Sequence, residues 1–498
     1  MLVEFKVGNY SSFKDIQSLR MAEVLRAKPV ESEKEHIRRT DYGGITRTMF
    51  LYGPNNAGKS NLIKAMRDAV EYIKDGDVLN RYGELCFKSL PYLYKGNNPK
   101  TVQSYFEFVI SIDGCDDPND NGIYSFGFNI GWDNYEPRLV CEWLYRNSSN
   151  GDECIYLVDW DCEGHPCIEG RDQVKKLINR VCESHYEEDD IESYGRGHPI
   201  MSGYFIDYYW KQNDCISPPE YLLKIRESLT DSFVFKIGDD PHDRIVIPST
   251  SPGAVMGYCN QLLGMRGINN RIELNLSKSG NKDVSGFNDV EVWFNDPDYQ
   301  NDVNGRVGNW TNEDMYGPLG ITLRYGIHEI PIKFRDGFTF TSKVADESSG
   351  TFRLVYLCIL LMYAERRSKM GKKTVLVIDE IESSLSTYAL FQIINLFKKN
   401  ENNRFKDVQL IATTHESRIL ENRSMWRIGV NKQNDNVWND PEYFGNSIGF
   451  VQRTPSGQDG SEIYSLRSFG KTDVRNCIGY VNHEYGSVPR IKKPRFVR

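Results

Sequence analysis

The stretch GPNNAGKS, residues 53–60, decides the fold that this sequence predicts. It satisfies the pattern G-x-x-x-x-G-K-[ST] and lies between a short apolar segment, TMFLYG, and a run of apolar residues at helical spacing that begins near Ser60. Gly53 and Gly58 let the backbone curl so that its N–H groups point inward, and the helix N-terminus adds a partial positive charge. We therefore predict a phosphate-binding loop between a buried strand and a helix.

The side chains of this loop predict how the phosphates of a nucleotide would be held. Lys59 would reach the β- and γ-phosphates, and the Ser60 hydroxyl would bind Mg²⁺. The alternative is a glycine turn with an incidental Gly-Lys-Ser, which the flanking strand and helix argue against. Together with the two glycines, the remaining residues expected to contact the nucleotide are Pro54, Asn55, Asn56, Ala57 and Asn61.

A second apolar segment, VLVIDE at residues 375–380, ends in two acids. Four apolar residues before the acids are typical of a buried parallel strand that ends at a site. We predict that Asp379 binds Mg²⁺, directly or through water, and that Glu380 takes a proton from an attacking water molecule. Two surface acids at the end of a strand are the alternative, but a P-loop requires such an acidic partner.

His415 closes a third apolar segment, LIATTH. A histidine at the end of a strand is often only an edge residue that its neighbours satisfy. Because the same chain carries a P-loop and an acidic pair, we predict instead that His415 senses the γ-phosphate and acts in catalysis with Glu380.

A polar turn, DESSGT at residues 346–351, comes directly before the apolar run 354–364. Serine hydroxyls and backbone N–H groups at a helix N-terminus form an anion site on the same principle as the P-loop. A simple N-cap by one of the two serines is compatible with that role. The residues expected to contact phosphate in this turn are Ser348, Ser349, Gly350 and Thr351.

The composition indicates a globular protein in a reducing compartment. Hydrophobic residues make up 39% and charged residues 26% of the chain, and the net charge of −8 means that a nucleic-acid site would have to be a local basic patch. The 11 cysteines follow no regular spacing, as free thiols do. No signal peptide is evident and the longest apolar run, 354–364, is too short to cross a bilayer, so we expect a cytoplasmic location.

The texture of the sequence predicts three parts. Residues 1–150 hold the P-loop and several alternating apolar and polar segments, which predict an antiparallel β meander. Residues 151–318 are rich in Asp, Asn, Gly, Pro and Tyr, and we expect a mainly helical insertion that serves as a partner or oligomer interface. Residues 319–498 hold the polar turn, the acidic pair and His415.

The motifs GPNNAGKS, ESSGT, VIDE and TTH occur in this order with a long insertion between the first two. This set resembles ABC-type ATPases of the SMC and OLD (overcoming-lysogenization-defect) kind. More narrowly, segments such as VEFKVGNYSSFKD, CEWLY and VIDEIESSL look like the ATPase subunits of bacterial anti-phage systems, of which PARIS and Septu are examples. The resemblance covers about residues 1–147 and 320–490.

The resemblance implies an α/β fold: an ABC-type P-loop ATPase head with a mixed sheet, flanking helices and an antiparallel β lobe. It also implies ATP and Mg²⁺ as cofactors, slow ATP hydrolysis and a head-to-tail homodimer. ATP on the P-loop of one copy would be clamped by Ser348, Ser349 and Gly350 of the other. Arg353 would help to hold that phosphate or would only lie at the helix start, and Phe13 would contact the adenine base.

The chain departs from the family pattern at two points. Where the family has Leu-His-Pro after the catalytic acid, this chain has Leu385, Ser386 and Thr387. No glutamine matches the metal-sensing glutamine of the family, since Gln103 and Gln173 are weakly placed.

The function that the resemblance implies is a nucleotide-switched sensor or scaffold subunit of an anti-phage defence system. It would hold a separate effector nuclease or toxin until a phage-derived trigger appears. The Toprim nuclease domain of OLD proteins is not evident after His415, which favours a separate effector. The alternatives are a DNA-acting SMC-like repair ATPase, an OLD-like nuclease component, or a scaffold that binds ATP only for assembly.

Weaker patterns favour ordinary structure. Cys154, Cys162, His165 and Cys167 lie close together but form no C-x₂-C pair, so a strand–turn–strand with incidental thiols is favoured over a zinc site. The basic tail 489–498 would either touch nucleic acid or an acidic partner, or be a solvated terminus.

Overall fold

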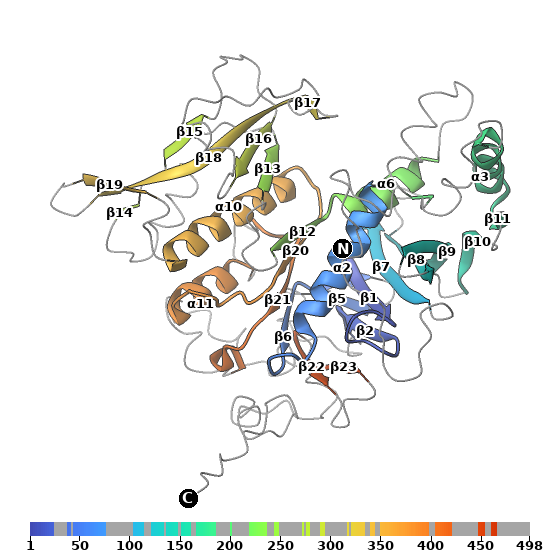
Figure 1. Cartoon of the computed structure of the whole chain (residues 1–498), viewed down its shortest axis with the longest axis horizontal. Helices are drawn as coiled ribbons and strands as arrows, with labels where there is room; N and C mark the ends of the chain where they lie inside the picture. The colour runs from blue at the N-terminus through green and yellow to red at the C-terminus, as the bar shows by residue number, and fades with distance from the viewer. Residues whose placement is uncertain are drawn as a thin grey trace, which may run out of the picture.

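Figure 1 shows the computed structural model of the 498-residue chain. The structure describes residues 1–23, 37–40, 43–75, 103–113, 121–133, 136–147, 151–160, 166–185, 200–201, 219–236, 244–248, 271–272, 275–278, 289–293, 316–317, 320–333, 339–343, 349–397, 404–420, 447–453 and 460–465.

A six-stranded sheet forms the centre of the molecule, in the order β12-β20-β21-β6-β22-β23. The first five strands are parallel, and β23 is antiparallel to β22. All residues of β6, β20 and β21 are buried, as expected of parallel strands covered on both faces. The strands are β6 (Thr48–Tyr52), β12 (Phe233–Lys236), β20 (Thr374–Ile378), β21 (Val408–Thr413), β22 (Ile448–Arg453) and β23 (Ser461–Ser465).

Helices cover both sides of this sheet (Figure 1). Helix α10 (Ser349–Lys369) packs against β20 and β21, and α11 (Thr387–Leu396) lies on the same side in the view. On the other side, α2 (Lys59–Asp75) and α6 (Glu220–Thr230) pack against each other, and α2 also contacts β1. In the part of the chain that the structure describes, none of the helices is long and apolar enough to span a membrane.

A seven-stranded antiparallel sheet packs beyond α2 and confirms the predicted β meander. Its order is β11-β10-β9-β8-β7-β1-β2. The inward face is rich in phenylalanine, and the Phe106 and Phe128 rings stack with their centroids 5.3 Å apart. The strands are β1 (Leu2–Gly8), β2 (Gln17–Arg20), β7 (Ser104–Asp113), β8 (Asn121–Asp133), β9 (Glu136–Asn147), β10 (Glu153–Trp160) and β11 (Pro166–Gly170).

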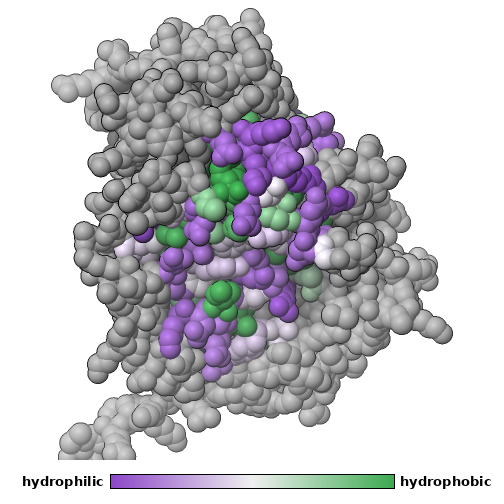
Figure 2. Space-filling view, turned by 90° about the vertical axis from the view of Figure 1, so that its right-hand side faces the viewer, coloured by the Kyte–Doolittle hydropathy of each residue, from purple (hydrophilic) through white to green (hydrophobic). Residues whose placement is uncertain are grey.

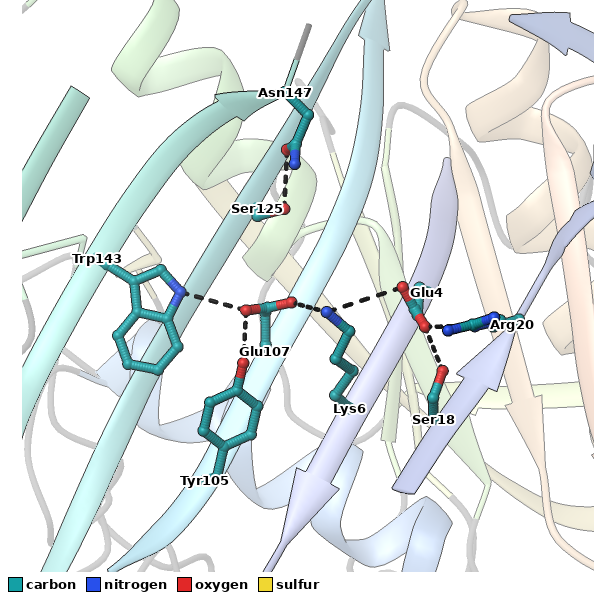
Figure 3. A network of polar contacts seen from close by, with 9 residues as sticks. All are labelled: Glu4, Lys6, Ser18, Arg20, Tyr105, Glu107, Ser125, Trp143 and Asn147. Atoms are coloured by element: carbon teal, nitrogen blue, oxygen red, sulfur yellow. Dashed lines mark hydrogen bonds and ion pairs between the residues drawn. The ribbon is translucent and has the colours of Figure 1, made fainter. Parts of the chain in front are cut away.

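On the side of the molecule that Figure 2 shows, the described residues are mostly hydrophilic, with hydrophobic patches between the polar side chains. Glu107 of β7 accepts hydrogen bonds from Lys6 Nζ (2.5 Å), the Tyr105 hydroxyl (2.6 Å) and Trp143 Nε1 (3.3 Å), as Figure 3 shows. Glu107 is only 7% exposed but its carboxylate has three donors from β1, β7 and β9, so the network ties these strands together.

The mainly helical insertion at 151–318 stays a prediction, although in the residues of this region that the structure describes the strands outnumber the helices. These residues contain the helices α3 (Asp172–His185) and α6. β10 and β11 extend the antiparallel sheet past residue 150, and β12 joins the central parallel sheet. The strands of this region are short and flanked by turn residues, and β12 pairs with a strand far away in the sequence, so the local pattern did not predict them.

Two further sheets complete the described residues. The seven-stranded one is built around β18, and α10 packs against its strand β13; the other has three strands. Their strands are β13 (Arg244–Pro248), β14 (Arg271–Ile272), β15 (Asn275–Lys278), β16 (Asp289–Trp293), β17 (Tyr316–Gly317), β18 (Gly320–Lys333), β19 (Thr339–Lys343), β3 (Ala22–Glu23), β4 (Ile37–Thr40) and β5 (Gly43–Thr46); a 3₁₀ turn, η3, spans Ser417–Leu420.

Glu142 in β9 is a fully buried carboxylate that anchors a distant segment. It accepts hydrogen bonds from the Tyr156 hydroxyl (2.6 Å) and from the backbone N–H groups of Ile200 (2.8 Å) and Met201 (3.2 Å). Burial raises its pKa to about 7, although these three hydrogen bonds act in the opposite direction.

We predict that this raised pKa makes the stability of the protein depend on pH. The folded state holds the Glu142 proton more tightly than the unfolded state, so this contribution to stability is full below pH 4.5 and is lost as the pH rises through about 7. Over that window, the free energy of unfolding of the wild type should fall relative to that of Glu142→Gln by about 3 kcal/mol. Urea unfolding measured from pH 5 to 8 tests this, with the exposed Glu169→Gln as control. Parallel pH profiles for wild type and Glu142→Gln would contradict it.

Candidate functional site

The P-loop is enclosed by two segments that are distant in the sequence. A Cβ atom on Gly53 would lie 2.2 Å from the carbonyl oxygen of Val451 in β22. Gly58 has a φ of +108°, and its Cβ would lie 2.6 Å from Ser12 Oγ and 2.7 Å from Ser461 Oγ. Both positions therefore require glycine, as the motif predicts.

Lys59 begins α2 and is almost fully buried, with 6% of its surface exposed. Its ammonium group donates hydrogen bonds to the carbonyl oxygens of Gly53 (2.8 Å) and Pro54 (3.1 Å), so it lies across the loop. Ser60 follows it and is partly exposed. The loop thus offers a cation, a hydroxyl and the free N–H groups of the first helical turn in one place.

Three carboxylates lie close enough to Lys59 to affect its protonation. Burial lowers the pKa of Lys59, while the charges of Asp379, Glu380 and Glu382 act to raise it. These acids follow β20, two strands away from β6 in the sheet, and the carboxyl ends of parallel strands meet at one edge. The fold therefore brings the predicted acidic pair to the P-loop.

Thr413, the last residue of β21, connects the two predicted acids. Its hydroxyl donates a hydrogen bond to Asp379 Oδ1 and accepts one from the backbone N–H of Glu380 (2.7 Å). Asp379 is buried, at 7% exposure, while Glu380 is exposed and has a φ of +47°. Thr413 thus orients the buried acid and shapes the turn that presents the exposed one. This role of Thr413 was not predicted, because nothing in the local sequence marks it except the pair of threonines before His415.

His415 lies at the same edge and is half-buried. Its backbone N–H donates a 2.6 Å hydrogen bond to Glu382 Oε1. Burial and then the charge of Lys59 lower the pKa of His415, whereas Glu382, Glu380 and Asp379 act to raise it. His415, Lys59 and the acids therefore form one electrostatic group.

The predicted polar turn falls partly outside the described residues. Ser348 lies outside them, and Ser349, Gly350 and Thr351 form the first turn of α10. Arg353, in the next turn, is 5% exposed. Its Nη2 donates to the carbonyl oxygens of Asp379 (2.8 Å) and Glu380 (3.2 Å) in the same chain. Arg353 therefore links the start of α10 to the acidic turn, rather than lying free at the helix start.

Phe13 and Lys236 lie near the site but were not correctly anticipated, the first because its expected role does not fit and the second because no role was predicted. Phe13 is fully buried in the hydrophobic core, so its ring is not available to an adenine base in this structure. The strand beside β20 ends in Lys236, whose carbonyl accepts a 2.8 Å hydrogen bond from Asp379 N. The Lys236 ammonium lies 4.4 Å from the ring centroid of Tyr356 in α10. A buried lysine thus ends the strand next to the acids.

The donor set fits Mg²⁺ bound together with a nucleotide better than a metal held by protein alone. Among the residues that the structure describes, no group of three or more His, Cys, Asp or Glu could hold a metal ion. Mg²⁺ typically uses one or two carboxylates, a hydroxyl, water and substrate phosphates. Ser60 and Asp379 supply a hydroxyl and a carboxylate of this kind, whereas Cys162 and His165 of the zinc alternative lie outside the described residues.

Comparison with protein families gives one match to the chain. The family described as "AAA domain, putative AbiEii toxin, Type IV TA system" matches residues 49–165 and 267–421, which is more than half of the sequence. Its first segment contains the P-loop, and its second contains the acidic pair and His415. No curated protein matches the chain.

Three solved structures are similar to the chain at low scores. They are an SMC head bound to the C-terminal winged-helix domain of ScpA (11% identity, 93% of this chain and 97% of that chain, TM-score 0.39), the SMC head domain from Thermotoga maritima (13%, 93% and 98%, 0.32), and the recombination mediator RecF with ATP (14%, 83% and 93%, 0.32). With TM-scores below 0.5, the assignment of fold depends instead on the strand order, the P-loop and the family match.

We predict that Thr413→Val disconnects the acids from β21. Valine has the same shape but leaves Asp379 and the Glu380 N–H without this partner, which costs about 1–3 kcal/mol of stability. Misplacement of the acids should also weaken Mg²⁺-dependent nucleotide binding by roughly tenfold or more. Thr414→Val is the matched control, because the Thr414 hydroxyl accepts a hydrogen bond from the nearby Glu416 N–H (3.0 Å) and, among the described residues, hydrogen-bonds to neither acid. Calorimetric titration with Mg-ATP measures both variants; equal affinities would contradict the role of Thr413.

Proposed function

The chain belongs to the family of AAA domains described as "putative AbiEii toxin, Type IV TA system", and from this we propose that it is a nucleotide-switched ATPase subunit of an anti-phage defence system. In this role it binds Mg-ATP, hydrolyses it slowly and controls a separate effector nuclease or toxin. The α/β P-loop ATPase head that the sequence predicts is the fold observed, with a mixed sheet, flanking helices and an antiparallel β lobe.

One observation carries the ATPase part of this proposal: Lys59, the acids after β20 and His415 meet at one edge of the parallel sheet. Lys59 would bind the β- and γ-phosphates, and Ser60 and Asp379 would hold Mg²⁺, which neutralises the developing charge. Glu380 is exposed at this edge, where it can accept a proton from the attacking water. His415 would contact the γ-phosphate.

The polar turn at the start of α10 supports an assembly in which two copies share their nucleotides. Ser348, Ser349 and Gly350 of one copy would clamp ATP on the P-loop of the other, since the N-terminus of a helix favours an anion. Arg353 connects this helix to the acidic turn of its own chain. When the polar turn of one copy binds the nucleotide of the other, Arg353 would thus transmit the movement to the acidic turn of its own site.

The sensor part of the proposal is supported by the family description, which names a toxin of a toxin–antitoxin system. Regions outside the ATPase elements, between 151 and 318, would contact the effector or a phage-derived trigger. The net charge of −8 argues against a DNA-acting repair ATPase, which needs a basic channel. A chain that is itself the toxin is a second candidate, because the same description names one. Growth arrest on expression of this chain alone would favour that candidate.

We predict that two substitutions separate nucleotide binding from hydrolysis. Lys59→Ala should lose ATP affinity, because it removes the buried cation of the loop. Glu380→Gln should bind ATP normally but lose on the order of 10²- to 10³-fold in hydrolysis rate. ATP titration and phosphate release measure the two effects. Failure of Glu380→Gln to bind ATP would show that its role is wrongly assigned.

We also predict that ATP drives assembly. Glu380→Gln with Mg-ATP should form a stable dimer or larger oligomer in light scattering, while the same protein without nucleotide should not. Adding Ser348→Arg should block this assembly and leave ATP binding intact, because the bulky cation would stand between the two copies. Co-expression with the product of the neighbouring gene tests for an effector. A protein that stays monomeric with ATP bound would contradict the shared-nucleotide arrangement.

A further inference from the structure

Glu382 is a carboxylate of the site to which the motifs assign no role. It follows Glu380 by two positions, in a turn that is held against β21 on both sides. The Glu380 N–H donates to Thr413 Oγ1 (2.7 Å) and the Ile381 N–H to the Thr413 carbonyl (3.1 Å). Two further turn bonds, from Ser383 N to Glu380 O and from Leu385 N to Glu382 O, fix the backbone of Glu382. Its side chain is thereby directed at the residues that follow β21.

One oxygen of Glu382 already holds the backbone of His415. The His415 N–H donates to Glu382 Oε1 at 2.6 Å, a short bond in which the acceptor carries a charge. This contact continues the pairing of β20 and β21 beyond the last pair of their ladder, Ile378 and Ala412. The position of His415 at the sheet edge therefore depends on Glu382.

The second oxygen of Glu382 has no hydrogen-bond donor among the described residues. This oxygen, Oε2, is shielded from solvent. A buried carboxylate oxygen without a donor is costly and uncommon, so it indicates a group that completes its hydrogen bonds in another state of the site. The charge of Glu382 acts on both Lys59 and His415, which places these two cation-capable groups nearby.

We propose that Glu382 is the positioning residue of His415: Oε1 fixes its backbone, and Oε2 receives one imidazole N–H when nucleotide is bound, so that the other ring nitrogen faces the γ-phosphate. This inference rests on the proposed ATPase function. It assigns the partner that orients the histidine to Glu382 rather than to Glu380, which is exposed and free to act on water. A hydrogen-bond acceptor at one ring nitrogen of a histidine fixes both the tautomer and the orientation of the ring.

Two substitutions distinguish the roles of the two Glu382 oxygens. Glu382→Gln keeps a carbonyl oxygen for the His415 N–H but presents an NH₂ group to the imidazole, and Glu382→Ala removes both contacts. Glu416→Gln is the matched control, because Glu416 is next to His415 in the chain but its Oε2 accepts from the Thr387 hydroxyl (3.1 Å). Hydrogen exchange of the His415 amide, ATP affinity, kcat and KM are measured for each.

We expect Glu382→Gln to lower kcat about tenfold or more, bounded by the loss of on the order of 10²-fold for His415→Ala, with ATP affinity and KM unchanged. Its His415 amide should stay protected, whereas that of Glu382→Ala should exchange faster. In a His415→Ala background, Glu382→Gln should have no further effect, because the two residues act as one unit.

A wild-type kcat for Glu382→Gln would overturn the proposal, since Oε1 alone would then explain the residue. A loss of rate that persists in the His415→Ala background would also overturn it, because Glu382 would act independently of His415. A wild-type protein that binds no ATP would overturn the proposed function and this inference with it. Normal ATP turnover with an unaffected Glu382→Gln would overturn only the inference.

Discussion

The register between β20 and β21 is the constraint on which the rest of the site depends. The two strands pair in parallel up to Ile378 and Ala412, so their polar residues leave the sheet at the same level. Beyond this pair, the Thr413 hydroxyl takes over from backbone pairing: it donates a hydrogen bond to Asp379 Oδ1 and accepts one from the Glu380 N–H. Because one hydroxyl serves both acids, a shift of either strand would misplace the carboxylates relative to Lys59. The chemistry of the site is thus set by backbone pairing and a single threonine.

Segments from both ends of the chain complete this edge. Ser12, after β1, and Ser461, at the start of β23, meet at Gly58 and are joined by a 2.8 Å bond from Ser461 N to the Ser12 carbonyl. From the other side, Arg353 of α10 holds the carbonyls of the acidic turn. The P-loop is therefore formed only when distant parts of the chain have packed together. Under the proposed function, this dependence would couple nucleotide binding to the packing of these distant segments.

The sequence predicts the parts of the site that local chemistry determines. GPNNAGKS and VLVIDE each combine a buried strand with the polar groups that follow it, and the meander follows from alternation over β7 to β9. Thr413 and Glu382 were missed, and the contact of Arg353 with the acidic turn was not predicted, because no periodic pattern encodes contacts between strands and helices. In the described part of 151–318 the strands were not predicted, because short strands such as β12 pair with partners more than 100 residues away. Residue identity marks the chemistry, but only the fold shows which oxygen faces which donor.

The buried polar groups of this protein are of two kinds: some accept several hydrogen bonds, and others have no partner among the described residues. Glu107 and Glu142 each accept three hydrogen bonds, which tie together segments of the antiparallel lobe. Around the P-loop the reverse holds: Ser12 Oγ, Ser461 Oγ, Arg353 Nε and Glu382 Oε2 are shielded from solvent and have no partner among the described residues. Each such group costs free energy in this state, and a bound nucleotide with its metal and water can supply partners to those that it reaches. Unpartnered buried groups beside the P-loop are expected where a ligand, rather than the protein, completes the hydrogen bonding.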